Sequence, residues 1–415
     1  MLETWYKVDN VAKVFIATNT RRDPRVFRVS CTLNEMVDQA ALDAALEKTV
    51  RQFKNFQVTL HRGLFWHYME STDKMPKAEP ETRPPCTEIY GNDNKNELLY
   101  RVSYYGPRIN VEMFHALSDG NGGIVFLKTI VCYYLKERHP KELANVVPSY
   151  DASEAELAQD SFQKFYGKRK APEGAKGGAY RLHGAKLPYD QTQYFEAHLS
   201  VRQMREQAKA SGGTMTSYLA AMLMLAIDAD MPPLDHNRPI VISIPVNLRN
   251  YYPSVTARNF FNTVKISHLF VGGETLPSLS AELADKLHDA LSEKNIKAQM
   301  DSYEQLEHMP GIKPVPLFIK NKAVSFFNWL ETRKETATIS NMGRVEVGDT
   351  LTPYLKGFSS VSSTYSLFIC VCSYGDDLTL GISSVFRNTN VLKNFFRGLS
   401  GNGLDVTLYA TEVEN

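Results

Sequence analysis

The segment GKRKAPEGAKGGAYRLHGAKLP, which starts at Gly167, interrupts the chain close to its middle. It gathers glycine, proline and lysine without helical or strand periodicity, and this composition is typical of a linker between domains. The whole chain of 415 residues is longer than one ordinary hydrophobic core supports, whereas each part beside the segment suits one domain. We therefore predict an N-terminal domain over residues 1–170, a linker over 171–190 and a C-terminal domain over 191–415.

Helix and strand patterns alternate on both sides of the linker. The N-terminal part predicts one strand, two hairpins and two helices, which cover residues 26–38 (strand), 38–53 (helix), 56–70 and 97–120 (hairpins) and 122–139 (helix). The C-terminal part predicts strands over 193–200, 238–246 and 263–271, strands near 337–341, 366–374 and 377–386, and helices from 201, over 214–227 and over 277–298. Mixed elements in both parts predict an α/β fold of two sandwich domains, each with helices packed on a mixed sheet.

The charge balance and the cysteines argue against several classes of protein. Lysine plus arginine number 47 against 46 acidic residues, so no field of the whole chain attracts nucleic acid or an anionic membrane. The chain shows no leader-like N-terminal pattern and no run of about 18 apolar residues. The five cysteines are scattered and form no C-x-x-C pair. We expect a cytoplasmic protein without a membrane span, a nucleic-acid partner or a metal site.

The stretch FHALSDGNGG, residues 114–123, places a histidine at the end of a predicted strand and before a glycine-rich corner. A dinucleotide-binding fingerprint fails because Val125 stands where its third glycine is required, and no Walker lysine follows. A calcium loop starting at Asp119 fails because its twelfth position is Ile130 rather than glutamate. From these residues alone, His115 is either a general base at the edge of a cleft or a structural side chain beside a turn.

The pattern H-x-x-x-D-G, formed by His115, Asp119 and Gly120, resembles the active-site motif of the chloramphenicol-acetyltransferase-like superfamily of coenzyme-A-dependent acyltransferases. The resemblance extends over both halves, to the alcohol acetyltransferase and condensation-domain branch, through VDNVAKVFIATNT, GGTMTSYLAAMLMLAI, IPVNLRNYYPSVTARNFFNTV and TATISNMG. The D-F-G-W-G motif of plant members is missing. The resemblance implies two chloramphenicol-acetyltransferase-like domains with the active-site tunnel between them.

The resemblance also implies how the reaction proceeds. His115 would take a proton from an acceptor hydroxyl or amine, which attacks the thioester directly, so that no covalent acyl-enzyme is needed. Ser340 is the first candidate for the donor that stabilises the oxyanion and Asn341 the second, although Ser340 equally suits a strand-end turn. Asn262 matches a polar position of the family but has no role derivable from the sequence.

Three residues would support this site rather than react. The resemblance implies that Asp119 points away from His115 and pairs with Arg249 to hold the loop, while a turn acceptor for backbone N–H groups is the alternative role for Asp119. Gly120 would let the backbone turn and leave room for substrate.

The expected function is acyl-CoA-dependent transfer of an acyl group, most simply acetyl, to a small-molecule alcohol or amine. Acyl-CoA is a co-substrate, and no bound cofactor is expected. Two alternatives stay open. A carrier protein could deliver the acyl group, although Phe114 stands where condensation domains usually carry a second histidine; or the chain could be a catalytically silent binding protein on this fold. We expect a monomer, because two fused domains can replace a subunit interface.

Overall fold

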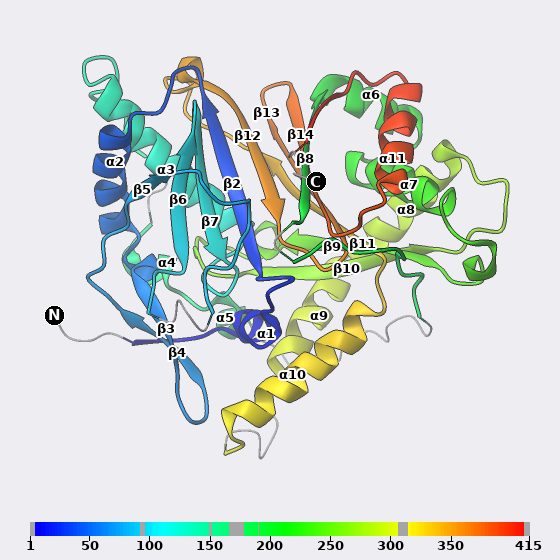
Figure 1. Cartoon of the computed structure of the whole chain (residues 1–415), viewed down its shortest axis with the longest axis horizontal. Coiled ribbons are helices and arrows are strands. Elements are labelled where there is room, and N and C mark those ends of the chain that lie inside the picture. Colours follow the sequence, from blue (N-terminus) through cyan, green and yellow to red (C-terminus); the bar gives the residue numbers. More distant parts are fainter. Residues whose placement is uncertain are drawn as a thin grey trace.

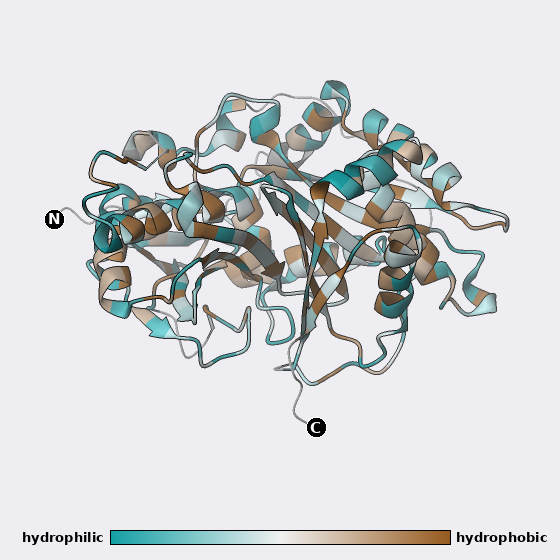
Figure 2. Ribbon diagram, turned by 90° about the horizontal axis from the view of Figure 1, so that it is seen from above, coloured by the Kyte–Doolittle hydropathy of each residue, from teal (hydrophilic) through white to brown (hydrophobic). Residues whose placement is uncertain are grey.

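The computed structural model describes residues 5–91, 96–148, 152–165, 178–189, 191–305 and 314–410. Figure 1 shows two lobes side by side, each with helices packed against a sheet. The predicted α/β fold of two sandwich lobes with mixed sheets is therefore confirmed. In Figure 2 the brown residues of the strands lie in the interior of each lobe, while the helices alternate between teal and brown.

The N-terminal lobe is built on a five-stranded sheet in the order β12-β2-β7-β6-β5. Its strands are β2 (Val26–Leu33), β5 (Ala78–Pro80), β6 (Tyr100–Tyr105), β7 (Arg108–Phe114) and β12 (Leu355–Ser362). The helices α2 (Gln39–Gln52) and α3 (Gly120–Arg138) pack against each other, and α3 contacts β2 and β7. One hydrophobic core lies between these helices and the sheet.

Local signals account for the start of both helices and for the hairpin before α3. The Asp38 side chain accepts the amide of Ala41 and caps α2. Asp119 caps α3 in the same way by accepting the amide of Gly122 at 3.0 Å. Gly106 takes the left-handed backbone, with φ of 54°, that the turn between β6 and β7 requires. The end of β7 and the start of α3 thereby face each other across residues 115–119.

The C-terminal lobe contains a seven-stranded sheet in the order β10-β9-β11-β13-β14-β8-β15. Its strands are β8 (Gln193–Ser200), β9 (Ile240–Asn247), β10 (Phe261–His268), β11 (Ala337–Arg344), β13 (Leu367–Tyr374), β14 (Asp377–Ser384) and β15 (Thr407–Ala410). Its helices are α6 (Val201–Ala210), α7 (Met215–Asp228), α8 (Leu276–Ala290), α9 (Glu293–Gln305) and α11 (Asn390–Gly401). The apolar helix α7 is buried along most of its length, which makes it the centre of the second hydrophobic core.

The long helix predicted over 277–298 is wrong in one respect, because the chain forms two helices there. α8 ends with Leu291 as its cap, and the carbonyl of Ser292 then accepts the amides of Asn295 and Ile296 to open α9. The Asn295 side chain donates to the carbonyl of Asp289 across the break. The apolar pattern continues through the break since both helices pack on the same core, and periodicity alone therefore does not reveal it.

Strand β12 connects the two lobes. It follows β11 in the chain but pairs antiparallel with β2, with Ser359 opposite Ser30, and it also contacts β13 and β14. A Cβ on Gly381 would lie 1.8 Å from the carbonyl oxygen of Ser360, so only glycine permits this close approach of β14 to β12. The boundaries at 170 and 190 stay predictions, and residues 166–177 of the linker region lie outside the described residues.

Smaller elements complete the fold, several of them at the bottom of Figure 1. They are the sheet of β1 (Trp5–Lys7), β4 (His67–Ser71) and β3 (Val58–Arg62), the helices α1 (Asn10–Thr18), α4 (Glu154–Leu157), α5 (Ser161–Phe165) and α10 (Leu317–Thr332), and the short 3-10 helices η1 (Lys54–Phe56), η2 (Pro233–Asp235), η3 (Leu248–Asn250) and η4 (Thr352–Tyr354). Within the described ranges no single helix has the length and apolar character to cross a bilayer, although the bent pair α6 and α7 passes that test together.

Candidate active site

His115 directly follows β7 and lies where the two lobes meet. Its half-buried ring stacks on Phe15 of α1, with 4.2 Å between ring centroids, and is flanked by Phe27 of β2 at 4.9 Å. Phe261 of β10, in the other lobe, lies 5.7 Å away. Three phenylalanines from both lobes therefore enclose the imidazole in an apolar environment.

The backbone of His115 is held from two sides. Its amide donates to the carbonyl of Arg25 at 2.8 Å, and Arg25 takes the left-handed backbone, with φ of 53°, that is uncommon for a residue with a side chain. The carbonyl of His115 accepts the side-chain amide of Asn259 at 2.9 Å. These contacts set the position of the ring before any substrate arrives.

Asn259 also determines which ring nitrogen of His115 carries the proton. Because its NH₂ group donates to the backbone carbonyl, its Oδ1 faces the ring, 3.4 Å from Nδ1 of His115. That oxygen only accepts, so the neutral ring carries its hydrogen on Nδ1 and leaves the lone pair on Nε2. Burial lowers the pKa of His115 below its ordinary value of 6.5, and the charge of Asp119 opposes this effect only in part. The imidazole is thus neutral at pH 7 and able to accept a proton at Nε2.

Asp119 is buried and holds other residues rather than His115. Its Oδ1 caps α3, while its Oδ2 accepts from the guanidinium of Arg249 and from the amide of Phe260, both at 2.8 Å. The structure thus brings Asp119 and Arg249 together as an ion pair across the lobes. Its carboxylate serves as helix cap and ion-pair partner at once.

Arg249, on η3, gathers the loop between η3 and β10 around its guanidinium. It donates to the carbonyl of Thr256 at 2.8 Å and to that of Arg258 at 2.7 Å, in addition to Asp119. Asn259 is the next residue of this loop. The buried ion pair therefore places the side chain that in turn orients His115.

Two glycines allow the close packing at the start of α3. A Cβ on Gly122 would lie 2.3 Å from the carbonyl oxygen of Ala257, and backbone cannot move aside there. A Cβ on Gly120 would lie 2.9 Å from Cε of Met342, so this methionine of β11 already fills the space beside the turn. The contact brings strand β11 next to the loop that carries His115.

The two candidate oxyanion donors on β11 point to opposite faces of the strand. Asn341 faces α7, where its amide donates to the hydroxyl of Thr216 at 2.9 Å, and its Oδ1 accepts the amide of Gly343. Ser340 is half-buried and lies on the other face of the strand, away from Asn341, while a β-bulge at Met342 interrupts the alternation beyond Asn341. Of the pair, Asn341 is therefore engaged with α7, and Ser340 stays a prediction.

Asn262 is engaged elsewhere. Its amide donates to Oε1 of Gln299 on α9 at 2.9 Å, and its Oδ1 accepts the amide of Thr263. The amide that contacts His115 belongs instead to Asn259, three residues earlier in the same motif segment. The sequence places both asparagines in the same segment, separated by two phenylalanines, and offers no signal to distinguish them, so Asn259 was missed.

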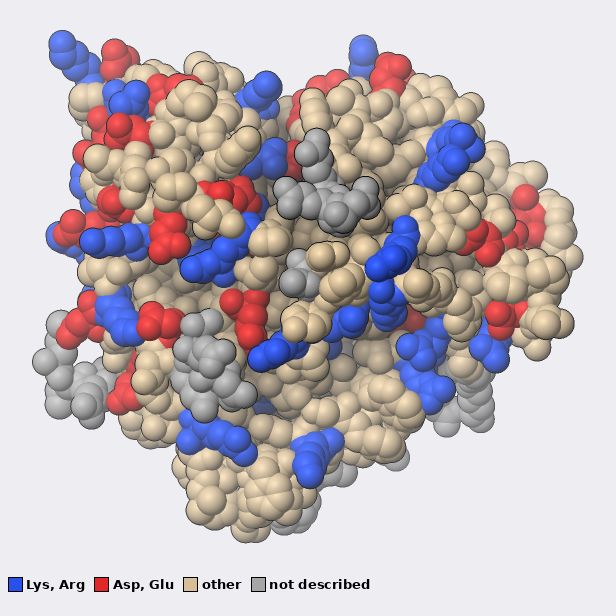
Figure 3. Space-filling model, viewed as in Figure 1, with Lys and Arg blue, Asp and Glu red and all other residues tan. Residues whose placement is uncertain are grey.

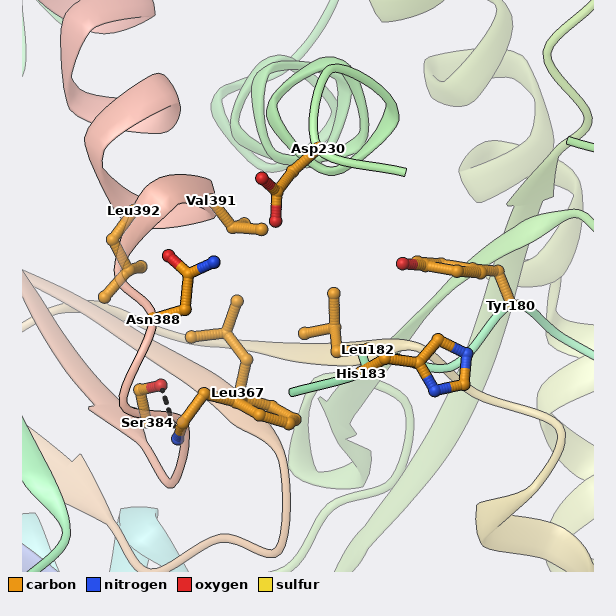
Figure 4. A pocket seen from close by; sticks show the side chains of 10 residues that line it. Tyr180, Leu182, His183, Asp230, Leu367, Ser384, Asn388, Val391 and Leu392 are labelled. Atoms are coloured by element: carbon orange, nitrogen blue, oxygen red, sulfur yellow. Dashed lines mark hydrogen bonds between the residues drawn. The ribbon is translucent and has the colours of Figure 1, made fainter. Parts of the chain in front are cut away.

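A separate pocket lies in the C-terminal lobe, away from His115. Figure 4 shows Tyr180 and His183 on one side of it and Asn388 and Val391 on the other, with Asp230 above. Its volume of about 30 Å³ holds no more than a few water molecules. This pocket is too small for an acyl donor. Among the described residues, no group of three His, Cys, Asp or Glu side chains is placed to hold a metal ion.

No family model and no curated protein matches this chain. Three solved structures illustrate its structural likeness. Polyketide synthase associated protein 5 from Mycobacterium tuberculosis is 14% identical, with a TM-score of 0.60 over 96% of this chain and 98% of that one. The epimerization domain from the third module of tyrocidine synthetase B is 14% identical, with a TM-score of 0.61 over 97% and 98%. A starter condensation domain of rhizomide synthetase RzmA, in complex with C8-CoA and Leu-SNAC, is 12% identical, with a TM-score of 0.57 over 96% and 94%.

These likenesses cover almost the whole chain, and at such low identity they show the fold alone. The chain has the two-lobed fold of condensation and epimerization domains. The fold that the resemblance implies, in its condensation-domain-like form, is therefore confirmed.

Proposed function

We propose that this chain is an acyltransferase that moves an acyl group from a thioester to an alcohol or amine, with His115 as the general base. The observation that carries the proposal is the state of His115, a neutral imidazole whose Nδ1 faces Asn259 and whose Nε2 retains its lone pair. Its place at the junction of the lobes supports a substrate tunnel between them.

The proposed reaction needs one base and no covalent enzyme intermediate. Nε2 of His115 removes the proton of the acceptor hydroxyl or amine while its oxygen or nitrogen bonds to the thioester carbonyl carbon. The resulting tetrahedral intermediate carries its negative charge on the former carbonyl oxygen. When the carbon–sulfur bond breaks, the thiolate leaves with the electron pair and takes the proton back from His115. A thiol with an ordinary pKa near 8.5 is a good leaving group.

Ser340 is our candidate for the group that donates to the oxyanion. It lies on the face of β11 opposite Asn341, whose amide already donates to Thr216. A donor that faces the reacting carbonyl oxygen stabilises the charge that develops there. Asp119 and Arg249 act as positioning residues through the loop that carries Asn259.

The donor that we propose first is acyl-CoA, most simply acetyl-CoA. An acyl chain on a carrier protein is the second candidate, because several of the similar structures are condensation domains of synthetases. Phe114, which stands where condensation domains usually carry a second histidine, is weak evidence against the carrier-protein donor. It is fully buried and stacks on Tyr90, so its side chain points into the core, away from His115.

The test measures free thiol released from acetyl-CoA and octanoyl-CoA across a panel of small alcohols and amines. Wild type is compared with His115→Ala and with His61→Ala, a histidine on the surface strand β3. We expect acceptor-dependent thiol release that is lost only in His115→Ala. If neither coenzyme A thioester reacts but an acyl group on a carrier protein does, the second donor is correct. No transfer from any of these thioesters would leave the catalytically silent binding protein as the remaining function.

A further inference from the structure

Helix α10 presents its apolar side chains outward. Of its residues only Leu317 is buried, whereas Phe326 is 55% exposed, Phe327 64% and Trp329 48%. Phe318, Ile319 and Leu330 are exposed as well. An amphipathic helix on a protein surface normally turns such a stripe toward the core, so this arrangement calls for a partner outside the chain.

The face of α10 that turns toward the protein makes polar contacts beside the buried Leu317. Ser325 donates to the carbonyl of Ala17 at 2.6 Å, and the amide of Asn321 lies 3.3 Å from Nε2 of His67. Helical spacing of 100° per residue puts Asn321 and Ser325 within about 40° of each other, and Phe327 lies on the far side of the helix from Ser325. The helix is therefore anchored through hydrogen bonds, and its apolar face is left for another contact.

The tip of the β3–β4 hairpin extends this apolar face. Leu64 is 72% exposed and Trp66 57%. The tip is joined to α10 by the amide of Leu317, which donates to the carbonyl of Leu64 at 2.9 Å, and by Lys320, whose ammonium donates to the carbonyl of Phe65. Figure 1 shows the hairpin tip beside this end of α10 at the bottom of the molecule. We call the combined set the aromatic surface; its residues are Leu64, Trp66, Phe318, Ile319, Phe326, Phe327, Trp329 and Leu330.

Basic residues border the aromatic surface. Residues 317–334 contain four of them, and the only acidic residue in this range is Glu331, which pairs with Lys334. Arg333 lies over the ring of Trp329, 4.6 Å from its centroid. In Figure 3 the lower end of the molecule shows blue side chains among tan ones and no red. A chain with a net charge of only +1 therefore carries a local excess of positive charge beside the aromatic surface.

We propose that the aromatic surface docks onto an anionic lipid bilayer. Tryptophan and phenylalanine next to lysine and arginine suit the boundary between acyl chains and negative headgroups. The surface consists of the outer face of a helix and a hairpin tip, which enter a bilayer surface without unfolding. This inference is independent of the proposed acyl transfer.

The test is cosedimentation of the full chain with phosphatidylcholine vesicles that contain either none or about 30% phosphatidylserine. We expect wild type to pellet with the anionic vesicles and to remain mostly in solution with neutral ones. The double variant Phe326→Ser/Trp329→Ser should bind at least about tenfold more weakly. Lys322→Glu/Arg333→Glu should lose the preference for anionic vesicles. Tyr105→Ser/Leu234→Ser, at positions that are 71% and 92% exposed elsewhere, should bind like wild type.

Two further measurements distinguish a loss of membrane binding from a folding defect. Circular dichroism should show that each variant keeps the wild-type helix content, since the replaced side chains face solvent. Tryptophan emission of wild type should shift to shorter wavelength with anionic vesicles, because Trp66 and Trp329 leave water. Wild type that stays in solution with anionic vesicles, or an apolar variant that binds as tightly as wild type, overturns the proposal. The proposal is also overturned if wild type is a dimer, Phe326→Ser/Trp329→Ser is a monomer and neither protein binds vesicles. That result would assign the aromatic surface to contact with a second copy of the chain.

Discussion

At the scale of single residues, the state of His115 depends on one amide. Asn259 holds both the carbonyl and Nδ1 of His115, so the ring is oriented and its tautomer selected by the same side chain. The aromatic rings around it remove water, which lowers the pKa of His115. A histidine with this environment is a base at neutral pH rather than a cation.

The pH dependence of the proposed transfer follows from this pKa. We expect kcat/KM to rise with pH as His115 loses its proton, and to reach half of its plateau below pH 6.5, the ordinary value for histidine. A profile of thiol release against pH measures this limb. A half-rise above pH 6.5 would contradict the low pKa that burial confers.

Replacing Asn259 should affect the reaction in a way that a merely structural residue would not. The hydrogen bond that His115 donates to Oδ1 of Asn259 raises the pKa of His115, so Asn259→Ala should move the acid limb of the pH profile to lower pH. It should also lower kcat by about 10–100-fold, because the tautomer is no longer selected. Asn262→Ala, the matched control, should leave the limb in place since that amide bonds to Gln299. Equal profiles for the two variants would exclude the role given to Asn259.

Gly122 allows a close approach that no other residue permits. The added methyl group of Gly122→Ala would meet the carbonyl of Ala257, so we expect a loss of about 1–3 kcal/mol in the free energy of unfolding. Gly348→Ala is the control, as its Cβ would enter open space. Urea unfolding measures the free energy of unfolding of both variants. Similar midpoints would show that the loop containing Ala257 moves to make room for the added methyl group.

At the scale of elements, one ion pair joins the start of α3 to the loop before β10. Asp119 and Arg249 are both nearly buried, and each makes further hydrogen bonds to backbone groups. Breaking a buried pair from one side leaves an uncompensated charge. The link between elements therefore depends on both partners together.

A double-mutant cycle tests this link. Arg249→Met should cost about 3–5 kcal/mol in the free energy of unfolding, because Asp119 stays buried without its partner. Asp119→Asn retains the ability to cap α3. The double variant should lose clearly less than the sum of the two single losses, measured by urea unfolding. Additive losses would mean that the pair is not coupled.

Element patterns in the sequence were informative to different degrees. The hairpins and the helices α2, α3 and α7 were predicted because their caps, turns and apolar stripes are local. The break between α8 and α9 was missed because one core covers both helices. No sequence pattern pointed to α10 as a helix with an outward apolar face, since the same periodicity describes a helix that buries it.

At the scale of the whole molecule, a charged cluster joins the sheets of the two lobes. Arg108 of β7 donates to Glu196 of β8 at 2.9 Å, and His198 lies between Glu196 and Asp377 of β14. Hydrogen bonds to Asp377 and then to Glu196 raise the pKa of His198 to about 9. In the folded protein His198 is therefore a cation at neutral pH.

This cluster predicts how stability changes with pH. The folded pKa of His198 lies above its unfolded value of 6.5, so its contribution is fully present below pH 6.5 and is lost as pH rises through about 9. We expect the free energy of unfolding to fall over this range in wild type and to fall less in His198→Gln. Urea unfolding at several pH values measures the slope. The same slope in both proteins would show that His198 does not contribute.

By itself, the sequence determined what neighbours along the chain decide: the capped helices, the hairpins, the α/β class and the histidine motif at the end of β7. The tertiary structure decided which residues that are far apart in the sequence contact each other. It selected Asn259 rather than Asn262 as the partner of His115, placed β12 beside β2 and left the apolar side chains of α10 facing outward. The physical reason is that caps, turns and periodicity arise within a few residues, whereas a side chain between two lobes obtains its partner only when both lobes have packed.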